Sequence, residues 1–185
     1  GPADADIDAP EAWDIHTGNK LVRVGVVDTG IDYTHTDLAA NIWTNAGEIP
    51  ANGIDDDGNG YIDDIHGWDF CNDDSNPMDD NSHGTHCSGT IAGVGNNGIG
   101  VAGVNWTADL VALKFLDASG SGYDSDAADA IRYATDNGCK ITSNSWGGPG
   151  YADELLAAVE YANANGCLLA AAAGNDALNN DTSSN

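Results

Sequence analysis

One local pattern occurs twice in the sequence and limits the possible folds more than any other feature. A helix-type segment at residues 130–134 leads through Asn137-Gly138-Cys139 into a strand-type segment at 140–145, and the same order of elements recurs between residues 158 and 173. A glycine directly after a helix is typical of a helix end. Successive helix–turn–strand units predict right-handed crossovers between neighbouring parallel strands. The expected fold is therefore a doubly wound α/β fold with a mostly parallel sheet.

A third strand-type segment ends at an acid. Residues 21–27 are nearly all apolar and rich in valine, which is typical of a strand covered on both faces. Asp28 is the first acid after this segment, and Thr29-Gly30 ends the strand. Asp28 is thus expected at a carboxyl-terminal strand end, where open α/β sheets form binding crevices. The segment alone leaves two interpretations open, an acid that orients a histidine and a simple turn or cap residue.

Residues 83–93 combine a leading histidine with many small side chains. Such a run predicts a helix that packs closely in the interior, although glycine is a poor helix former. His83 would then be held rigidly beside a cleft. The alternatives are a core histidine or a metal pair of His83 and His86, and the latter is disfavoured because no further acidic or histidine ligand follows on the same helix.

A further apolar segment, residues 168–173, is predicted to be another buried strand, ending at Gly174-Asn175. An amide at such an edge can donate hydrogen bonds into the crevice, as an oxyanion hole requires. The order of Asp28, His83 and Asn175, together with their local sequences, resembles the subtilisin family of serine proteases, the subtilases. The similarity is greatest to the thermitase-like and proteinase K-like branches and spans residues 9 to about 175.

The resemblance implies a role for each of these residues. Asp28 would hold His83 in the productive tautomer, His83 would act as general base and then general acid, and Asn175 would stabilise the oxyanion. The sequence contains no Gly-Thr-Ser-Met-Ala type motif for the family's nucleophile. We therefore expect residues 1–185 to be the amino-terminal portion of one catalytic domain, inactive alone, with the serine in a carboxy-terminal remainder. A pseudoprotease that serves as a calcium-stabilised binding module is the alternative.

The charge balance restricts the partners. Five basic residues against 30 acidic ones give a formal net charge of -25, which argues against nucleic acid and requires cations or high salt for neutralisation. No segment is long and apolar enough to span a membrane. The expected protein is a secreted enzyme that acts on proteins or peptides, with a propeptide as a further candidate partner.

Many of the acids lie in one loop-type segment, residues 53–64. Oxygen-bearing side chains alternate with glycines there, as in the first half of an EF-hand loop, and hard oxygen ligands at this spacing suit calcium. His66 stands where an EF-hand has its bidentate glutamate, so an inserted calcium loop is expected and not a true EF-hand. A solvated acidic turn is the alternative. The candidate ligands are Asp55, Asp57, Asn59, Tyr61, Asp63 and Asp64.

The resemblance implies two more calcium loops. One lies just before His83 and would use the side chains of Asp69, Asn72 and Asp74 with backbone oxygens near Asn76 and Met78. The other follows the histidine helix. It would bind calcium through Asp37, the side chain of Asn97 and backbone carbonyls among Val94, Ile99 and Val101.

Two segments resemble the family's substrate-binding strands. Gly120, Ser121 and Gly122 form one, and Ser145, Trp146 and Gly147 form the other. In the family such segments clamp an extended peptide by strand pairing, a mode that tolerates many sequences. Trp146 would line the side-chain pockets. Without the resemblance, residues 120–122 are equally typical of a flexible turn.

The four cysteines are expected to be free where they can be assigned. By the resemblance, Cys87 is a buried thiol beneath His83 and not a nucleophile. Cys139 and Cys167 occupy equivalent strand starts and could form a disulfide, but adjacent parallel strands often hold such a pair in a poor geometry, so free thiols are expected. The sequence gives no assignment for Cys71.

Overall fold

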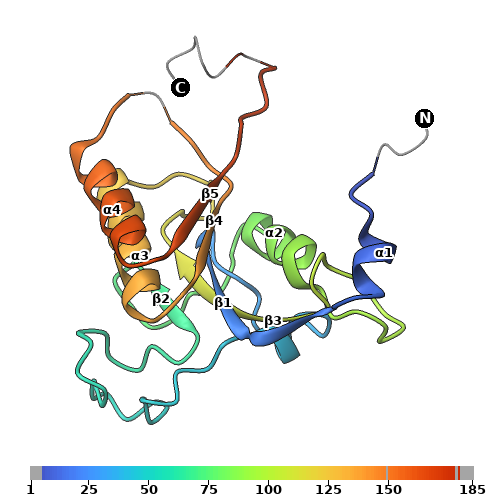
Figure 1. Cartoon of the computed structure of the whole chain (residues 1–185). Coiled ribbons are helices and arrows are strands. Elements are labelled where there is room, and N and C mark those ends of the chain that lie inside the picture. Colours follow the sequence, from blue (N-terminus) through green and yellow to red (C-terminus); the bar gives the residue numbers. More distant parts are fainter. Residues whose placement is uncertain (1–5, 149, 178, 180–185) are drawn as a thin grey trace.

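The centre of the molecule is a sheet of five strands, shown in a computed structural model that describes residues 6–148, 150–177 and 179 (Figure 1). The strands are β1 (Gly18–Asp28), β2 (Gly67–Asp69), β3 (Thr107–Lys114), β4 (Ile141–Asn144) and β5 (Leu168–Ala171). Their order in the sheet is β2-β3-β1-β4-β5, and every neighbouring pair is parallel. Because β3 and β4 flank β1 on opposite sides, the winding reverses at β1. The carboxyl end of β1 is thus where a doubly wound sheet forms its crevice.

Helices cover both faces of the sheet, as expected for a doubly wound α/β fold. They are α1 (Ala9–Trp13), α2 (His83–Ala92), α3 (Asp124–Asp136) and α4 (Asp153–Ala164), with the short 3-10 helix η1 (Ala39–Asn41). In Figure 1, α3 and α4 lie on one side of the sheet and α2 lies on the other. In the described part of the chain, no helix has the length and apolarity needed to cross a bilayer.

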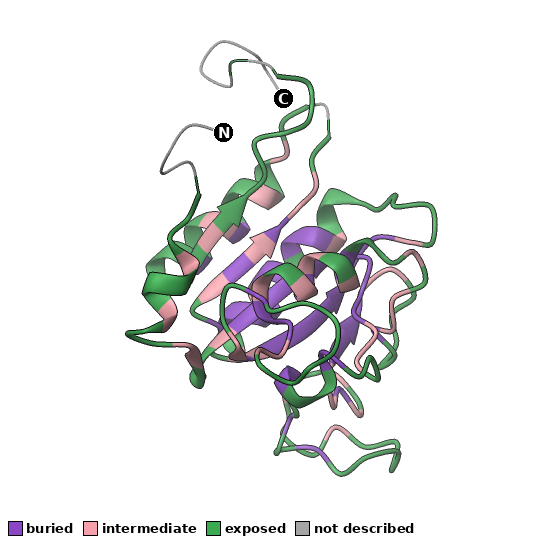
Figure 2. Cartoon of the chain, turned by 90° about the vertical axis from the view of Figure 1, so that its right-hand side faces the viewer, coloured by how far each residue is buried: buried purple, intermediate pink, exposed green. Residues whose placement is uncertain are grey.

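The buried residues form two clusters, one on each face of the sheet. Val27, Val111 and Leu113 belong to the cluster that includes the buried faces of α3 and α4. Val26 and Leu110 belong to the other cluster, which contains Ala92 of α2. Figure 2 shows this buried centre in purple, with the exposed loops around it. Successive residues of β1 therefore point into different cores, and this explains why residues 24–27 carry no polar alternation.

The predicted repeat is present, with one correction. Strands β4 and β5 pair in parallel with Ile141 opposite Leu168, and Gly138 and Gly166 follow α3 and α4 with positive φ. The prediction that residues 168–173 form a buried strand is wrong. Leu168 is 66% exposed, because β5 lies at the edge of the sheet in the part of the chain that the structure describes.

Candidate active site

Asp28 and His83 form a hydrogen-bonded pair at the carboxyl end of β1. The His83 Nδ1–H donates to Asp28 Oδ1 at 2.7 Å. Asp28 is the last residue of β1 and its side chain is 1% exposed, whereas His83 is the first residue of α2 and its side chain is 48% exposed. A carboxylate can only accept, so this contact fixes the proton on Nδ1 and leaves Nε2 as an acceptor. The expected contact between these two side chains is confirmed.

Among the described residues, only one oxygen of the Asp28 carboxylate accepts hydrogen bonds. Asp28 Oδ1 also accepts a hydrogen bond from the Thr29 amide at 2.7 Å. Its Oδ2 is buried and, among the described residues, has no hydrogen-bond partner. In the part of the chain that the structure describes, Oδ1 alone therefore anchors the Asp28 carboxylate, through His83 and the Thr29 amide.

Cys87 lies one helical turn after His83, with its Sγ 3.9 Å from His83 Nδ1. The thiol is free and half-buried, so it is less enclosed than the sequence predicted. Burial, and to a smaller extent the negative charge of Asp28, raises the pKa of the Cys87 thiol. A thiol with a raised pKa is a poor nucleophile at neutral pH. Cys87 thus lies beside the imidazole, with its thiol favoured over the thiolate.

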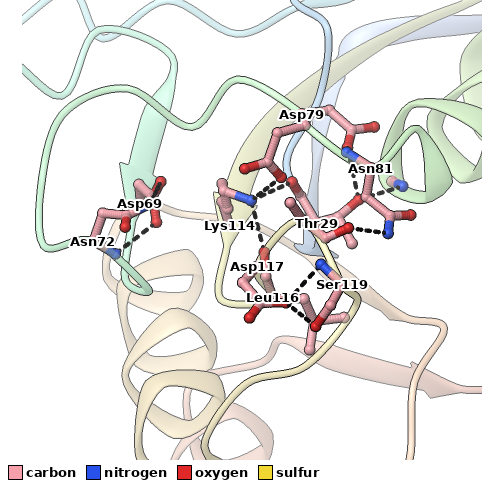
Figure 3. Close-up of polar contacts among 12 residues, drawn as sticks. Thr29, Asp69, Asn72, Asp79, Asn81, Lys114, Leu116, Asp117 and Ser119 are labelled. Carbon is pink, nitrogen blue, oxygen red and sulfur yellow. Dashed lines mark hydrogen bonds and ion pairs between the residues drawn. The ribbon is translucent and has the colours of Figure 1, made fainter.

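A network of hydroxyl and carboxylate groups fixes the beginning of α2. Asp79 Oδ1 accepts hydrogen bonds from the Thr29 hydroxyl and from the amides of Asn81 and Ser82, at 2.8, 2.9 and 2.9 Å. Asp79 Oδ2 accepts from the Thr85 amide at 2.9 Å, so the carboxylate caps the helix. Figure 3 shows Asp79, Asn81 and Thr29 meeting above the end of β3. Burial opposes ionisation of Asp79, but these hydrogen bonds outweigh it and lower the pKa of the carboxyl.

Gly84 allows α2 to approach the strand end. A Cβ at this position would lie 2.1 Å from the Gly30 carbonyl oxygen and 3.1 Å from Asp28 Cβ. The close approach requires glycine, because no side chain can occupy that space. Gly84, Ser88 and Ala92 form the buried side of the helix, in agreement with the small-residue pattern. This packing sets the distance between His83 and Asp28.

The two predicted substrate segments follow the strands that flank β1. Residues 120–122 follow β3 and are exposed, in a turn closed by the Asp117 amide, which donates to the Ser121 carbonyl at 2.8 Å. Residues 145–147 follow β4, and Trp146 packs edge-on against Phe115 with ring centroids 4.8 Å apart. Because β3 and β4 lie on either side of β1, the two segments begin on either side of Asp28.

The first acidic loop extends away from the sheet between η1 and β2 (Figure 1). In it, Asp55 and Asp57 lie together with Glu48, with one ligand atom from each within 4.8 Å of the others. Glu48 was not foreseen, because it precedes the alternating segment. Asp63 contacts this group through its amide, which donates to Glu48 Oε2 at 3.0 Å, while its carboxylate accepts hydrogen bonds from the amides of Asn52 and Gly53.

Asp64 is not a member of that carboxylate group, but Asn45 Nδ2 donates to both Asp64 and Asp57. Asp64 is fully buried and accepts hydrogen bonds from Tyr133, Asn45 and Asn59. Burial, the largest effect, raises the pKa of Asp64 despite these donors. Asn59 also accepts from the amide of Tyr61, whose ring packs edge-on against Tyr133 with centroids 4.8 Å apart. Asp64, Asn59 and Tyr61 therefore connect the loop to the core.

In the predicted calcium loop before His83, some of the expected ligands are hydrogen-bonded to one another. Asp69 is buried and accepts two hydrogen bonds from Asn72, whereas Asp74 is exposed and accepts from the Asn76 amide. Met78, half-buried, belongs to the same segment.

Asp37 is central to the third loop. It accepts hydrogen bonds from Asn97 Nδ2 at 2.7 Å and from the Val101 amide at 2.8 Å, and its carbonyl accepts from the Val94 amide at 2.9 Å. The Asn97 bond is the largest cause of a lowered pKa at Asp37. Ile99 is exposed at the tip, where its amide donates to Asn97.

Comparison with known proteins identifies the family. The profile of the subtilase family (Peptidase_S8) matches residues 19–185. The chain belongs to the subtilase family.

Three relatives illustrate how much of a subtilase the sequence covers. It is 40% identical over 169 residues to thermitase of Thermoactinomyces vulgaris, covering 91% of this chain and 52% of thermitase. It is 44% identical over 174 residues to halolysin of Haloferax mediterranei, covering 94% of this chain and 30% of halolysin. It is 42% identical over 139 residues to subtilisin-like protease 1 of Plasmodium vivax, covering 74% of this chain and 22% of that protein. The chain thus spans about half the length of thermitase and less of the other two.

In this subtilase, Asn175 is exposed in the segment after β5. The most important site residues that the sequence interpretation missed are Thr29 and Asp79. The residue directly before α2 is Ser82, which makes no side-chain cap hydrogen bond, so the usual capping signal does not point to Asp79. No local sequence signal indicates that the Thr29 hydroxyl donates to Asp79.

Proposed function

We propose that this subtilase sequence provides the Asp–His part of a calcium-dependent serine endopeptidase that hydrolyses peptide bonds. The 2.7 Å contact from His83 Nδ1–H to the buried Asp28 carboxylate carries the proposal. It lies at the carboxyl end of the central strand and is fixed by the capped, closely packed start of α2. A histidine held in one tautomer beside a buried acid is the arrangement that activates a hydroxyl nucleophile.

In the proposed mechanism, His83 Nε2 removes the proton of a serine hydroxyl as the hydroxyl attacks the peptide carbonyl. Asp28 stabilises the imidazolium that forms, and His83 then gives the proton to the leaving amine. The amide of Asn175 donates to the oxyanion of the tetrahedral intermediate. We propose that the serine belongs to the carboxy-terminal remainder of the same protease, since no nucleophile motif of the family occurs in these 185 residues.

The proposed substrate is an extended peptide bound between residues 120–122 and 145–147. Two features support this placement. The segments begin on either side of the strand that ends at Asp28, and a Cβ at Gly147 would meet nothing within 4 Å, so the backbone there is open to a ligand. Pairing through the peptide backbone would accept many sequences. Trp146, which rests on Phe115, would line a side-chain pocket.

Calcium is the proposed cofactor, held by carboxylate and carbonyl oxygens in the three loops. The group of Glu48, Asp55 and Asp57 supports one site, and the contacts of Asp37 with the loop that contains Asn97 support another. Oxygen ligands of this type fit calcium. Dependence on calcium suits an extracellular enzyme, so secretion belongs to the proposal. A removable propeptide is proposed from the family resemblance alone.

The test uses the complete catalytic domain, including the segment with the nucleophile. His83→Ala should lower kcat by about a hundredfold to ten-thousandfold on a peptide substrate, because it removes the general base. His86→Ala is the matched control, since His86 is exposed on the same helix and should leave kcat unchanged. A serine-directed phosphonate should label the wild type and should not label His83→Ala. A folded, calcium-binding domain with neither hydrolysis nor labelling would identify a non-catalytic binding module instead.

A further inference from the structure

Lys114 is a fully buried cation next to the candidate active site. It is the last residue of β3, is 1% exposed, and lies opposite Asp28 of β1 and Asp69 of β2 in the sheet register. Lysine is seldom buried to this extent unless its charge is compensated, because removing an ammonium group from water is costly. The position therefore calls for a specific set of partners.

The Lys114 amino group has three partners, one for each of its hydrogens. It donates to the Thr29 carbonyl at 3.0 Å, to the Leu116 carbonyl at 2.7 Å and to Asp80 Oδ1 at 2.7 Å. Figure 3 shows the amino group between Thr29 and Leu116, below the segment that contains Asp79. An ammonium group has three donors, so the hydrogen bonding is complete. Asp80 supplies the opposite charge from a side chain that is 48% exposed.

The three acceptors belong to three segments that the proposed reaction uses. Thr29 directly follows Asp28, Asp80 stands three residues before His83, and Leu116 begins the segment that contains Gly120 and Gly122. Without the ammonium group, the buried Thr29 and Leu116 carbonyls would each lose a hydrogen bond.

We propose that Lys114 is a positioning residue for the peptide substrate: its amino group holds residues 116–122 in place relative to Asp28 and His83. This inference rests on the proposed function, in which residues 120–122 pair with the substrate backbone. Lys114 touches neither the substrate nor the reacting atoms and acts through the Leu116 and Thr29 carbonyls. The opposite charge of Asp80 connects the same amino group to the segment before α2.

The first test is hydrogen exchange on the full chain. In Lys114→Met, which keeps an unbranched side chain one atom shorter and removes the donors, the amides of Asp117 and Ser121 should exchange about tenfold faster or more. Those two amides close the turn, by bonds of 2.8 Å to the Ser121 carbonyl and 3.0 Å to the Asp117 carboxylate. Amides of α4 should be unchanged. Asp80→Ala changes a half-exposed residue and provides a second variant should Lys114→Met not fold.

Asp129→Ala is the matched control for Asp80→Ala. It removes an ion pair with an N···O distance of 2.9 Å to Arg132 on the surface of α3, and it should leave exchange in residues 116–122 unchanged. Unchanged exchange at Asp117 and Ser121 in both Lys114→Met and Asp80→Ala would overturn the proposal.

The second test compares two substrates of the complete catalytic domain. For an extended peptide anilide, kcat/KM of Lys114→Met should fall about tenfold more than for a single-residue ester that does not reach residues 120–122. If Lys114 had a purely structural role, Lys114→Met would reduce only the folded fraction, and kcat/KM would fall equally for both substrates. That outcome would contradict the proposal. If the wild type hydrolyses neither substrate, the proposed function is wrong, and the exchange result alone then decides whether Lys114 orders the segment.

Discussion

Thr29 and Gly84 connect the strand that ends at Asp28 to the helix that begins at His83: the Gly84 amide donates to Thr29 Oγ1 at 2.9 Å. Both residues directly follow a member of the proposed catalytic pair. The same Thr29 hydroxyl donates to Asp79, which caps the helix. The Asp28–His83 distance is therefore set by backbone packing and capping, and not only by the two side chains.

Gly84→Ala should destabilise the fold. The added Cβ would lie 2.1 Å from the Gly30 carbonyl oxygen, so the helix must move away from the strand end. We expect the free energy of unfolding to fall by about 1–3 kcal/mol, as for other overpacked sites. Urea unfolding followed by circular dichroism measures this value.

The control for Gly84→Ala is Gly89→Ala on the same helix. A Cβ at Gly89 would meet only Val101 Cγ2, at 3.9 Å. It should raise the unfolding free energy by about 0.5–1 kcal/mol, because alanine is the better helix former. Equal effects of the two substitutions would show that the close approach at Gly84 is not the cause.

Asp79→Asn should weaken the fold in a pH-dependent way. Because the pKa of Asp79 is lowered in the folded protein, ionised Asp79 contributes stability above its unfolded pKa, and this contribution is lost as pH falls through the folded pKa. We expect a loss of about 1 kcal/mol at pH 7, as for other helix caps, shrinking below about pH 4. Urea titrations of both proteins between pH 3 and 7 measure the difference. A difference that is constant with pH would contradict the assigned role of the charge.

Calcium should raise the melting temperature by more than the screening of negative charges by a simple salt does. A ligand that binds only the folded state at a concentration of one hundred times Kd stabilises it by about 2.7 kcal/mol. Excess EDTA should therefore lower the melting temperature, and sodium chloride of equal ionic strength should not restore it fully, even at a net charge of -25. Equal recovery by the two salts would indicate charge screening alone.

Glu48→Gln tests one of the calcium sites separately. The substitution removes one charge from the group that contains Asp55 and Asp57, so it should reduce the calcium-induced rise in melting temperature. Asp153→Asn, an exposed change at the start of α4, controls for the loss of one negative charge and should leave the rise intact. The same reduction in both variants would argue against a site at Glu48.

All four cysteines should react as free thiols. Two of them, Cys139 and Cys167, should react only after the protein unfolds. Cys139 and Cys167 are buried, and burial raises the pKa of the Cys139 thiol to about 12. Alkylation of the folded protein at pH 8 should leave both unmodified, because the reactive thiolate is scarce and enclosed. Mass spectrometry after alkylation in denaturant without reductant should show four additions. Two additions would reveal a disulfide.

The sequence by itself determined the parallel α/β architecture, the position of Asp28 at a strand end and that of His83 at a helix start. These depend on local patterns: the repeated helix–glycine–strand unit, the apolar run before Asp28, and the small side chains after His83. The contact between the two side chains was implied by the family resemblance. Parallel strands bring their carboxyl ends to the same edge, so residues at strand ends meet even when they are far apart in the chain. The family resemblance added roles, which the local patterns alone do not supply.

Only the tertiary structure decided which polar groups are buried together. Asp64 belongs to an acidic loop in the sequence, yet it is enclosed with Tyr133, 69 residues away, while Glu48 from outside the pattern joins Asp55 and Asp57. In the sequence, Lys114 is an ordinary charged residue at the end of an apolar strand, and only the fold places three acceptors around its amino group. Periodicity records which face a residue occupies along its own element. A buried charge is compensated by groups from distant segments, and their approach depends on how all the elements pack.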